Sequence, residues 1–88
     1  MARFEMIGVD GAALGEANAS GDVLFQLGLM YSTGSTVPAD YVTAHKWFNL
    51  AAMRGNKEAS RLRREIAELM NEGEIAAAQR AARDWLRY

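Results

Sequence analysis

The chain has 88 residues, of which 50% are hydrophobic and 24% are charged. This composition is typical of one small folded domain and excludes a disordered or low-complexity chain. Ten Lys and Arg residues and eleven Asp and Glu residues leave a formal net charge of −1, so the bulk charge attracts neither nucleic acid nor anionic lipid. The sequence contains no cysteine, which excludes disulfides and cysteine-based zinc sites, and apolar packing must stabilise the fold.

The N-terminal residues 1–19 contain three glycines and no sustained hydrophobic period. We expect an arm here, with at most a short helical turn around residues 12–17. The apolar stretch Met6–Val9 is four residues long and ends at Asp10, which is too short for the core of a signal peptide. No uncharged run is long enough to span a bilayer. We therefore expect a soluble, cytoplasmic protein with no membrane partner.

Two helices are predicted in the first half of the chain. Ser20 can cap a helix over residues 21–33, which ends at Gly34. One face of this helix carries Leu24, Leu27, Gly28 and Tyr31. Asp40 can cap a second helix over residues 40–53, and one stripe of it is formed by Tyr41, Ala44, Trp47, Phe48 and Ala51.

Two further helices are predicted in the second half. Asn56 can cap a helix over residues 57–70, whose apolar positions recur at helical spacing: Ala59, Leu62, Ile66 and Leu69. Asn71 and Glu74 form a capping-box pattern before a helix over residues 72–86. Because the connections are short, we expect an all-α fold in which successive helices are antiparallel neighbours, stacked as two helical hairpins.

A weak internal repeat relates the two predicted hairpins. Shifting the chain by 38 residues aligns like residues: Leu24 with Leu62, Ala44 with Ala82, and Trp47 with Trp85. A period in this range is typical of proteins built from stacked helix pairs, in which one pair cannot bury its apolar face alone. We therefore expect residues 20–88 to form a single helical-repeat domain after the N-terminal arm.

The most distinctive residue spacing lies in the two helices of the first hairpin. The residues that carry it are Leu27, Gly28, Leu29, Met30, Tyr31, Gly34, Val37, Pro38, Asp40, Tyr41, Ala44, His45, Lys46, Trp47, Phe48, Ala51, Ala52 and Gly55. This pattern resembles the Sel-1-like repeat, a relative of the tetratricopeptide repeat, with one full motif over residues 21–59. Residues 60–88 resemble the degenerate helix pair that often follows the terminal repeat in bacterial members of that family.

The resemblance implies a right-handed superhelical stack of antiparallel helix pairs that serves as an adaptor or scaffold in protein complexes. It also implies a structural role for the motif residues Leu27, Gly28, Tyr31, Gly34, Ala44, Trp47, Ala51 and Gly55. The sequence departs from the family in two respects. The loop reads Gly34-Ser35-Thr36 where the family usually has Gly-x-Gly, and one full motif is present where a solenoid generally needs about three units.

The sequence contains no recognisable set of catalytic or metal-binding residues. His45 is the only histidine, and we expect it to be exposed because it lies off the apolar stripe of its helix. Four acidic residues lie near the turn between the third and fourth predicted helices. Glu65 and Glu68 can pair with Arg61 and Arg64. Glu72 and Glu74 suit the N-terminal end of the fourth helix, where the helix dipole favours negative charge. We therefore expect no enzyme, no metal site and no cofactor.

Five basic residues lie along or beside one edge of the third predicted helix: Arg54, Lys57, Arg61, Arg63 and Arg64. Glu58 and Glu65 are interleaved with them, and no aromatic residue is available there for base stacking. We expect a solvated face, with an acidic protein partner as the main alternative and nucleic acid as a minor one.

The first predicted helix is apolar on nearly all sides. Opposite its core-facing stripe lie Phe25, Gln26, Leu29 and Thr33. A helix of this kind must be buried on both sides or covered by a partner. In Sel-1-like repeats the first helix of each pair lines the concave binding face. Three occupants remain open: the chain's own arm, a second copy of the chain, and a foreign protein or peptide.

From these observations we predict a non-catalytic protein-interaction module whose recognition surface is formed by Phe25, Gln26, Leu29, Thr33 and Arg61. The alternative is a structural homo-oligomer or capping fragment that associates with itself through the helix over residues 21–33, in place of the missing repeats.

Overall fold

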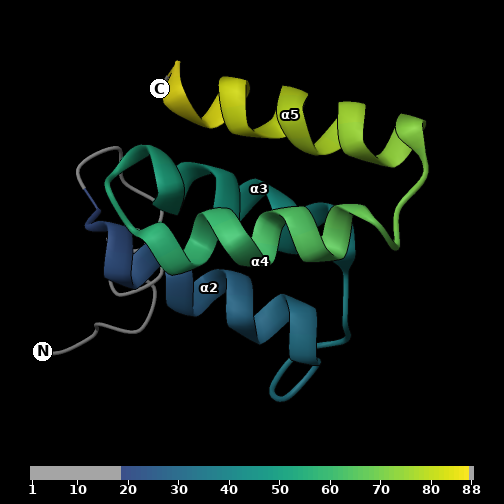
Figure 1. The fold of residues 1–88 in the computed structure, drawn as a ribbon, viewed down its shortest axis with the longest axis horizontal. Helices are drawn as coiled ribbons and strands as arrows, with labels where there is room; N and C mark the ends of the chain where they lie inside the picture. Colours follow the sequence, from purple (N-terminus) through teal and green to yellow (C-terminus); the bar gives the residue numbers. More distant parts are fainter. Residues whose placement is uncertain (1–18, 88) are drawn as a thin grey trace, which may run out of the picture.

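The computed structural model describes residues 19–87 as helices joined by short loops. In chain order the helices are α2 (Gly21–Thr33), α3 (Tyr41–Met53), α4 (Lys57–Ala67) and α5 (Glu72–Leu86) (Figure 1). No strand occurs in these residues, and the predicted all-α fold is confirmed. The predicted arm lies outside the described residues, apart from Ala19.

Each helix follows the residue that the sequence predicts as its cap. The side chains of Ser20, Asp40 and Asn56 each accept a hydrogen bond from the backbone N–H three residues further along. Asn71 and Glu74 form the predicted capping box, in which each side chain accepts from the other residue's backbone N–H, at 2.8 and 2.9 Å. These side chains satisfy backbone donors that a helix leaves unpaired in its first turn.

The loop between α2 and α3 closes tightly although it lacks the second glycine of the family pattern. Gly34 adopts the left-handed conformation, with φ of 71°, and its N–H donates to Met30 O at 3.0 Å. At the other end of the loop, Asp40 N–H donates to Tyr31 O at 2.9 Å. Thr36 is exposed, so the position that is usually glycine holds its side chain in solvent.

Two predicted helix boundaries differ from the structure. The second helix begins at Tyr41 rather than at residue 40, because Asp40 has the extended backbone of a cap, with φ of −151°. The third helix ends at Ala67 rather than at residue 70. The next three residues form a tight turn, in which each N–H donates to the carbonyl three residues earlier. The apolar spacing continues through this turn, but the Leu69 side chain is 65% exposed.

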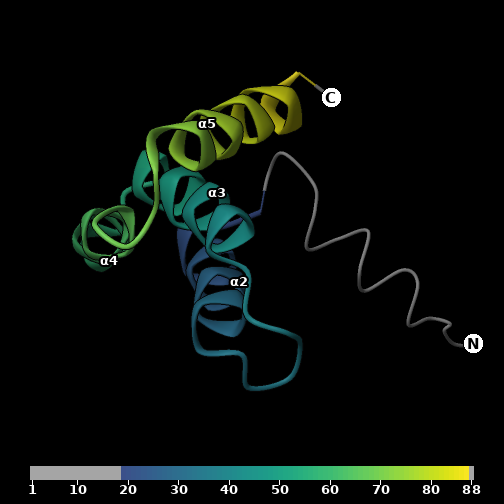
Figure 2. The same cartoon turned by 90° about the vertical axis from the view of Figure 1, so that its right-hand side faces the viewer.

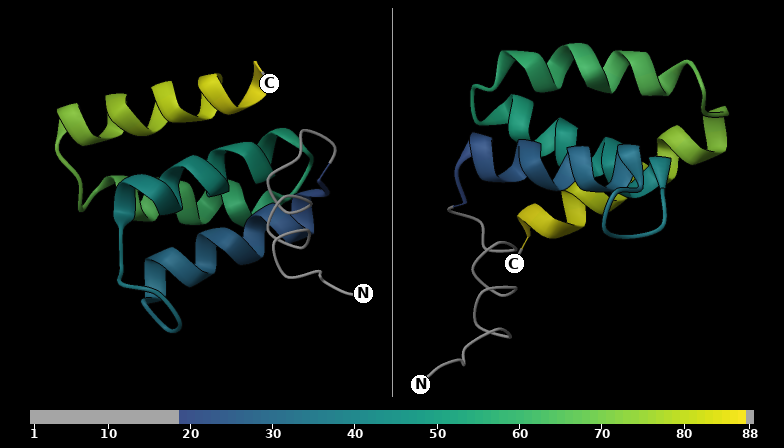
Figure 3. Two further views of the ribbon diagram at one scale, coloured as in Figure 1. Left: turned by 180° about the vertical axis from the view of Figure 1, so that it is seen from behind. Right: turned by 90° about the horizontal axis from the view of Figure 1, so that it is seen from below.

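Helix α3 lies at the centre of the molecule and packs against α2, α4 and α5. In Figure 2, α5, α3 and α2 form a column, and α4 lies to one side of it. Seen from below, α4 and α5 lie on opposite sides of α3 (Figure 3). Both helices pack against α3 and have few contacts with each other, so α4 and α5 do not pack as a hairpin of their own within the described residues. The short connection between them had predicted such a hairpin.

The core consists of a few large side chains surrounded by small ones. Phe48, Leu24 and Leu50 are fully buried, and the alanines that pack with them are Ala44, Ala51, Ala59 and Ala82. Gly28 is buried where α2 meets α3, and a Cβ atom at this position would lie 2.5 Å from Phe48 Cε1. The lack of a side chain at Gly28 therefore sets how closely α2 approaches α3.

Candidate interaction surface

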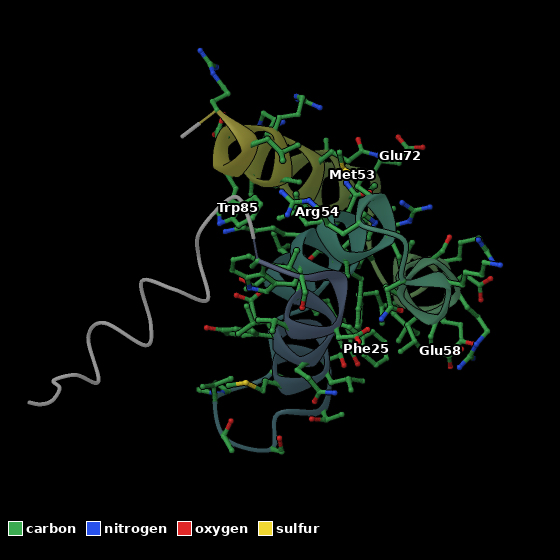
Figure 4. All side chains as sticks on the ribbon, turned by 90° about the vertical axis from the view of Figure 1, so that its left-hand side faces the viewer. Phe25, Met53, Arg54, Glu58, Glu72 and Trp85 are labelled. Atoms are coloured by element: carbon green, nitrogen blue, oxygen red, sulfur yellow. The ribbon has the colours of Figure 1, made fainter. Side chains whose placement is uncertain are left out.

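The apolar residues of the predicted surface lie on one flank of α2. Leu24 and Gly28 are buried in the core, while Phe25 and Leu29 are half-buried and pack against it. The Phe25 ring centroid lies 5.8 Å from that of Phe48. The prediction that Phe25 lies opposite the core is therefore wrong, because one residue turns a helix by only about 100° and leaves Phe25 beside Leu24. Figure 4 shows Phe25 on the side of α2 that faces α4.

The polar residues of the predicted surface, Gln26 and Thr33, are exposed. The Thr33 hydroxyl donates to Leu29 O at 2.8 Å, so its proton is used within the helix while its oxygen can still accept a hydrogen bond. The Gln26 amide offers both a donor and an acceptor. Helix α2 therefore presents an apolar flank beside two side chains that can form hydrogen bonds.

Arg61, the fifth residue of the predicted surface, is exposed on α4 and is held by two carboxylates. Its guanidinium forms ion pairs with Glu65, at 2.6 Å, and with Glu58. All three side chains are about half exposed, and ion pairs of this kind contribute at most about 1 kcal/mol each. One positive charge with two negative charges gives this group a net charge of −1, so it is not a basic patch.

Three of the other four basic residues of the predicted edge have separate contacts. Arg54 donates to Ala19 O at 2.8 Å, before the start of α2. Arg63 donates to Asn49 Oδ1 on α3 at 2.7 Å. Arg64 donates to a serine hydroxyl one turn earlier on α4, at 3.2 Å. The basic edge expected from the sequence is therefore divided among contacts within and between helices.

His45 is buried, with 4% of its surface exposed, and the prediction that it is exposed is wrong. The reason is that α3 is covered on several sides, so a position off one apolar stripe of this helix can still lie under a neighbour. Its Nδ1 atom is buried and has no hydrogen-bond partner among residues 19–87. Burial lowers the pKa of His45 below its ordinary value of 6.5, and the positive charge of Arg63 lowers this pKa further.

We expect the burial of His45 to make the protein less stable in mild acid. In the unfolded chain His45 takes up a proton near its ordinary pKa of 6.5, whereas in the folded protein it does so only at lower pH. The contribution of neutral His45 is therefore complete above pH 6.5 and is lost as the pH falls through the folded-state pKa, by at most about 1.4 kcal/mol per pH unit. Denaturant unfolding of the wild type and of His45→Leu between pH 7 and pH 5 measures this loss. Equal pH dependence of the two proteins would contradict it.

A group of aromatic and cationic residues on α3 and α5 was not predicted from the sequence. The rings of Trp47 and Trp85 meet edge to face, with centroids 5.9 Å apart. Lys46 Nζ lies 4.2 Å from the centroid of the Trp47 ring, and the Arg54 guanidinium carbon lies 5.7 Å from that of Trp85. Figure 4 shows Arg54 and Trp85 beside each other below α5. We call Lys46, Trp47, Arg54 and Trp85 the tryptophan cluster.

The described part of the chain contains no pocket and no group of three or more potential metal ligands. Two of the four glutamates near the turn between α4 and α5 have the contacts that the sequence predicts. Glu65 pairs with Arg61, and Glu74 accepts the N–H of Asn71 in the capping box. None of the helices within residues 19–87 is long and apolar enough to cross a membrane.

A protein-family model described as the Sel1 repeat matches residues 21–56. Residues 21–56 are a Sel1 repeat. Repeats of this family are non-catalytic and mediate interactions between proteins. No curated protein and no solved structure matches the chain. The match covers α2 and α3 and ends before α4, so the resemblance of residues 60–88 to a degenerate repeat stays a prediction.

The motif residues of the Sel1 repeat lie in and around the contact between α2 and α3. The small ones that are buried are Gly28, Ala44 and Ala51. The larger ones are half-buried and pack against the core: Leu27, Tyr31 and Trp47. Gly34 and Gly55 have positive φ angles of 71° and 94° after the two helices. The structural role that the resemblance implies for these residues stays a prediction, and the exposed residues of α2 lie outside this set.

Proposed function

We propose that this Sel1 repeat binds a protein or peptide partner on the exposed side of α2, through Phe25, Gln26, Leu29 and Thr33, with Arg61 of α4 at the margin. The observation that carries the proposal is the partial exposure of Phe25 and Leu29, which pack against the core and still leave part of their apolar surface accessible. A family whose repeats bind proteins supports it.

The chemistry of this surface favours a partner that brings an apolar side chain and hydrogen-bonding backbone. The apolar side chain would cover the flank formed by Phe25 and Leu29, and burial of apolar surface is the main favourable term in association. Gln26 and the Thr33 oxygen can bond to peptide N–H and C=O groups at the edge. Arg61 would contribute only if the partner replaced Glu58 or Glu65, because both carboxylates already hold its guanidinium.

Replacing Leu29 with aspartate should weaken partner binding at least about tenfold, which corresponds to 1.4 kcal/mol. A carboxylate at this position would have to lose its hydration when the partner covers the flank. The partner is first captured from an extract of the native host with the wild-type protein and identified. Its dissociation constant is then measured by titration with the wild type and with Leu29→Asp.

Gln79→Asp is the matched control, because it places the same charge on the exposed surface of α5. We expect this control to bind like the wild type. Circular dichroism must give the same helix content for all three proteins, since Leu29 also packs against the core. Equal affinity of Leu29→Asp and the wild type would refute the α2 surface.

Self-association through α2 is the second candidate, because one matched Sel1 repeat stands where a solenoid generally needs about three units. If the chain associates with itself in this way, the mass in solution exceeds that of one chain for the wild type. It falls to that of one chain for Leu29→Asp. Sedimentation equilibrium over a range of concentrations measures both. A wild type that stays monomeric rules this candidate out.

A further inference from the structure

We propose that the acidic N-terminal segment, residues 1–18, docks on the tryptophan cluster of α3 and α5 and leaves the exposed side of α2 free for a partner. This inference concerns a different surface from the proposed function and does not depend on it. It commits to the chain's own segment as the occupant of the cluster.

The point from which this segment departs is fixed beside the tryptophan cluster. Arg54 of the cluster donates a hydrogen bond to Ala19 O at 2.8 Å, and the same guanidinium lies 5.7 Å from the Trp85 ring. Close by, Asn56 Nδ2 donates to Asp22 Oδ1 at 3.2 Å, which links the first turn of α2 to the start of α4. The residues before Ala19 therefore leave the described structure next to Trp85.

The cluster contains a buried hydrogen-bond donor that no described residue satisfies. The Nε1 atom of Trp85 is buried, and none of residues 19–87 accepts its proton. A buried donor without an acceptor costs about 1–3 kcal/mol, so most such groups in folded proteins have a partner. Because this atom has almost no accessible surface, a backbone carbonyl of the segment can reach it only after the side chains that cover it move aside.

The charges of the segment and of the cluster are opposite. Residues 1–18 contain three acidic side chains and one basic side chain, which gives a side-chain charge of 1 − 3 = −2: Glu5, Asp10, Glu16 and Arg3. The cluster carries the two positive charges of Lys46 and Arg54, and neither forms an ion pair with a described carboxylate. Burial also lowers the pKa of Lys46, so a nearby carboxylate would stabilise its charged form.

The segment is long enough to cover the cluster, and its apolar residues suit the two indole rings. Arg54 directly follows α3 and lies eight residues after Lys46, which is a rise of about 12 Å, whereas 18 extended residues span up to about 60 Å. Phe4, Ile7 and Leu14 can pack on the aromatic faces. Figure 4 places Trp85 below α5 and Phe25 beside α2, on the side toward α4, so the cluster and the proposed binding surface are separate surfaces.

The lack of cysteine in the chain allows a test with one spin label on the full-length protein. A nitroxide is attached to Ala13→Cys, and paramagnetic broadening is measured by NMR on uniformly ¹⁵N-labelled protein. We expect the indole N–H signal of Trp85 to lose most of its intensity relative to the same signal after the nitroxide has been reduced. We expect the backbone N–H signals of Gln26 and Thr33 to keep theirs.

Lys46→Gln in the labelled protein should restore much of the Trp85 signal, because one of the two attracting charges is removed. Arg80→Gln is the matched control, since Arg80 is an exposed cation of α5 outside the cluster, and it should leave the broadening unchanged. Broadening centred on Gln26 and Thr33 would overturn the proposal in favour of an arm on α2. Absence of broadening anywhere would overturn it too. Broadening of the Trp85 signal in a mixture of spin-labelled unenriched protein with label-free ¹⁵N protein would also overturn it, because that broadening comes from a second copy.

Discussion

Replacing Phe48 with alanine should lower the free energy of unfolding by about 3–5 kcal/mol. Phe48 is the largest fully buried side chain of the described residues, and it fills the space between α2 and α3 against Phe25 and Gly28. The substitution removes its apolar contacts and leaves a cavity that the surrounding helices can fill only in part. Denaturant unfolding followed by circular dichroism measures the change.

The size of this loss is large for a protein of this length, because small domains are stable by only about 5–15 kcal/mol. Phe48→Leu is the control, since it keeps most of the apolar volume and should cost clearly less than alanine. If Phe48→Ala costs less than about 1 kcal/mol, the α2–α3 core described here is wrong.

Replacing Gly28 with alanine should destabilise the protein by about 1–3 kcal/mol, although alanine is the better helix former by about 1 kcal/mol. The new Cβ atom would lie 2.5 Å from Phe48 Cε1 and 3.0 Å from Phe48 Cγ. Phe48 is fully buried and has no space to retreat into, so α2 must move away from α3. The same unfolding experiment measures the cost.

Gly73→Ala is the matched control for this substitution. Gly73 lies in the first turn of α5, where a Cβ atom would meet only Asn71 Oδ1 at an ordinary 3.4 Å. Alanine there should leave stability unchanged or raise it by up to about 1 kcal/mol. The double variant Gly28→Ala with Phe48→Leu should cost less than the sum of its two parts, because the smaller side chain makes room for the methyl group. Strict additivity would mean that the two residues do not press on each other.

The starts of the helices could be predicted because a cap acts on backbone groups only a few residues away. Ser20, Asp40, Asn56 and Asn71 therefore mark their helices in the sequence itself. The end of α4 could not be predicted in the same way. Leu69 keeps the helical spacing of apolar residues, but it lies in an exposed turn, and the spacing alone does not separate the two cases.

The burial of His45 and the flank position of Phe25 depend on helices that are distant in the sequence. Periodicity within one helix indicates one contact face, whereas α3 has contacts with three other helices. The tryptophan cluster also depends on helices that are distant in the sequence, because Trp47 and Trp85 meet only once α5 has folded onto α3. The alignment of these two residues in the internal repeat was the one signal that related them, and it did not imply contact.

The central position of α3 has a consequence for how the chain unfolds. In a linear array of repeats, an end unit can detach while the others remain folded, because each unit contacts only its neighbours. Here α2, α4 and α5 all pack on the same helix, so loss of any one of them exposes part of the α3 surface. We therefore expect the described helices to unfold together as one cooperative unit, because α3 is the element they share.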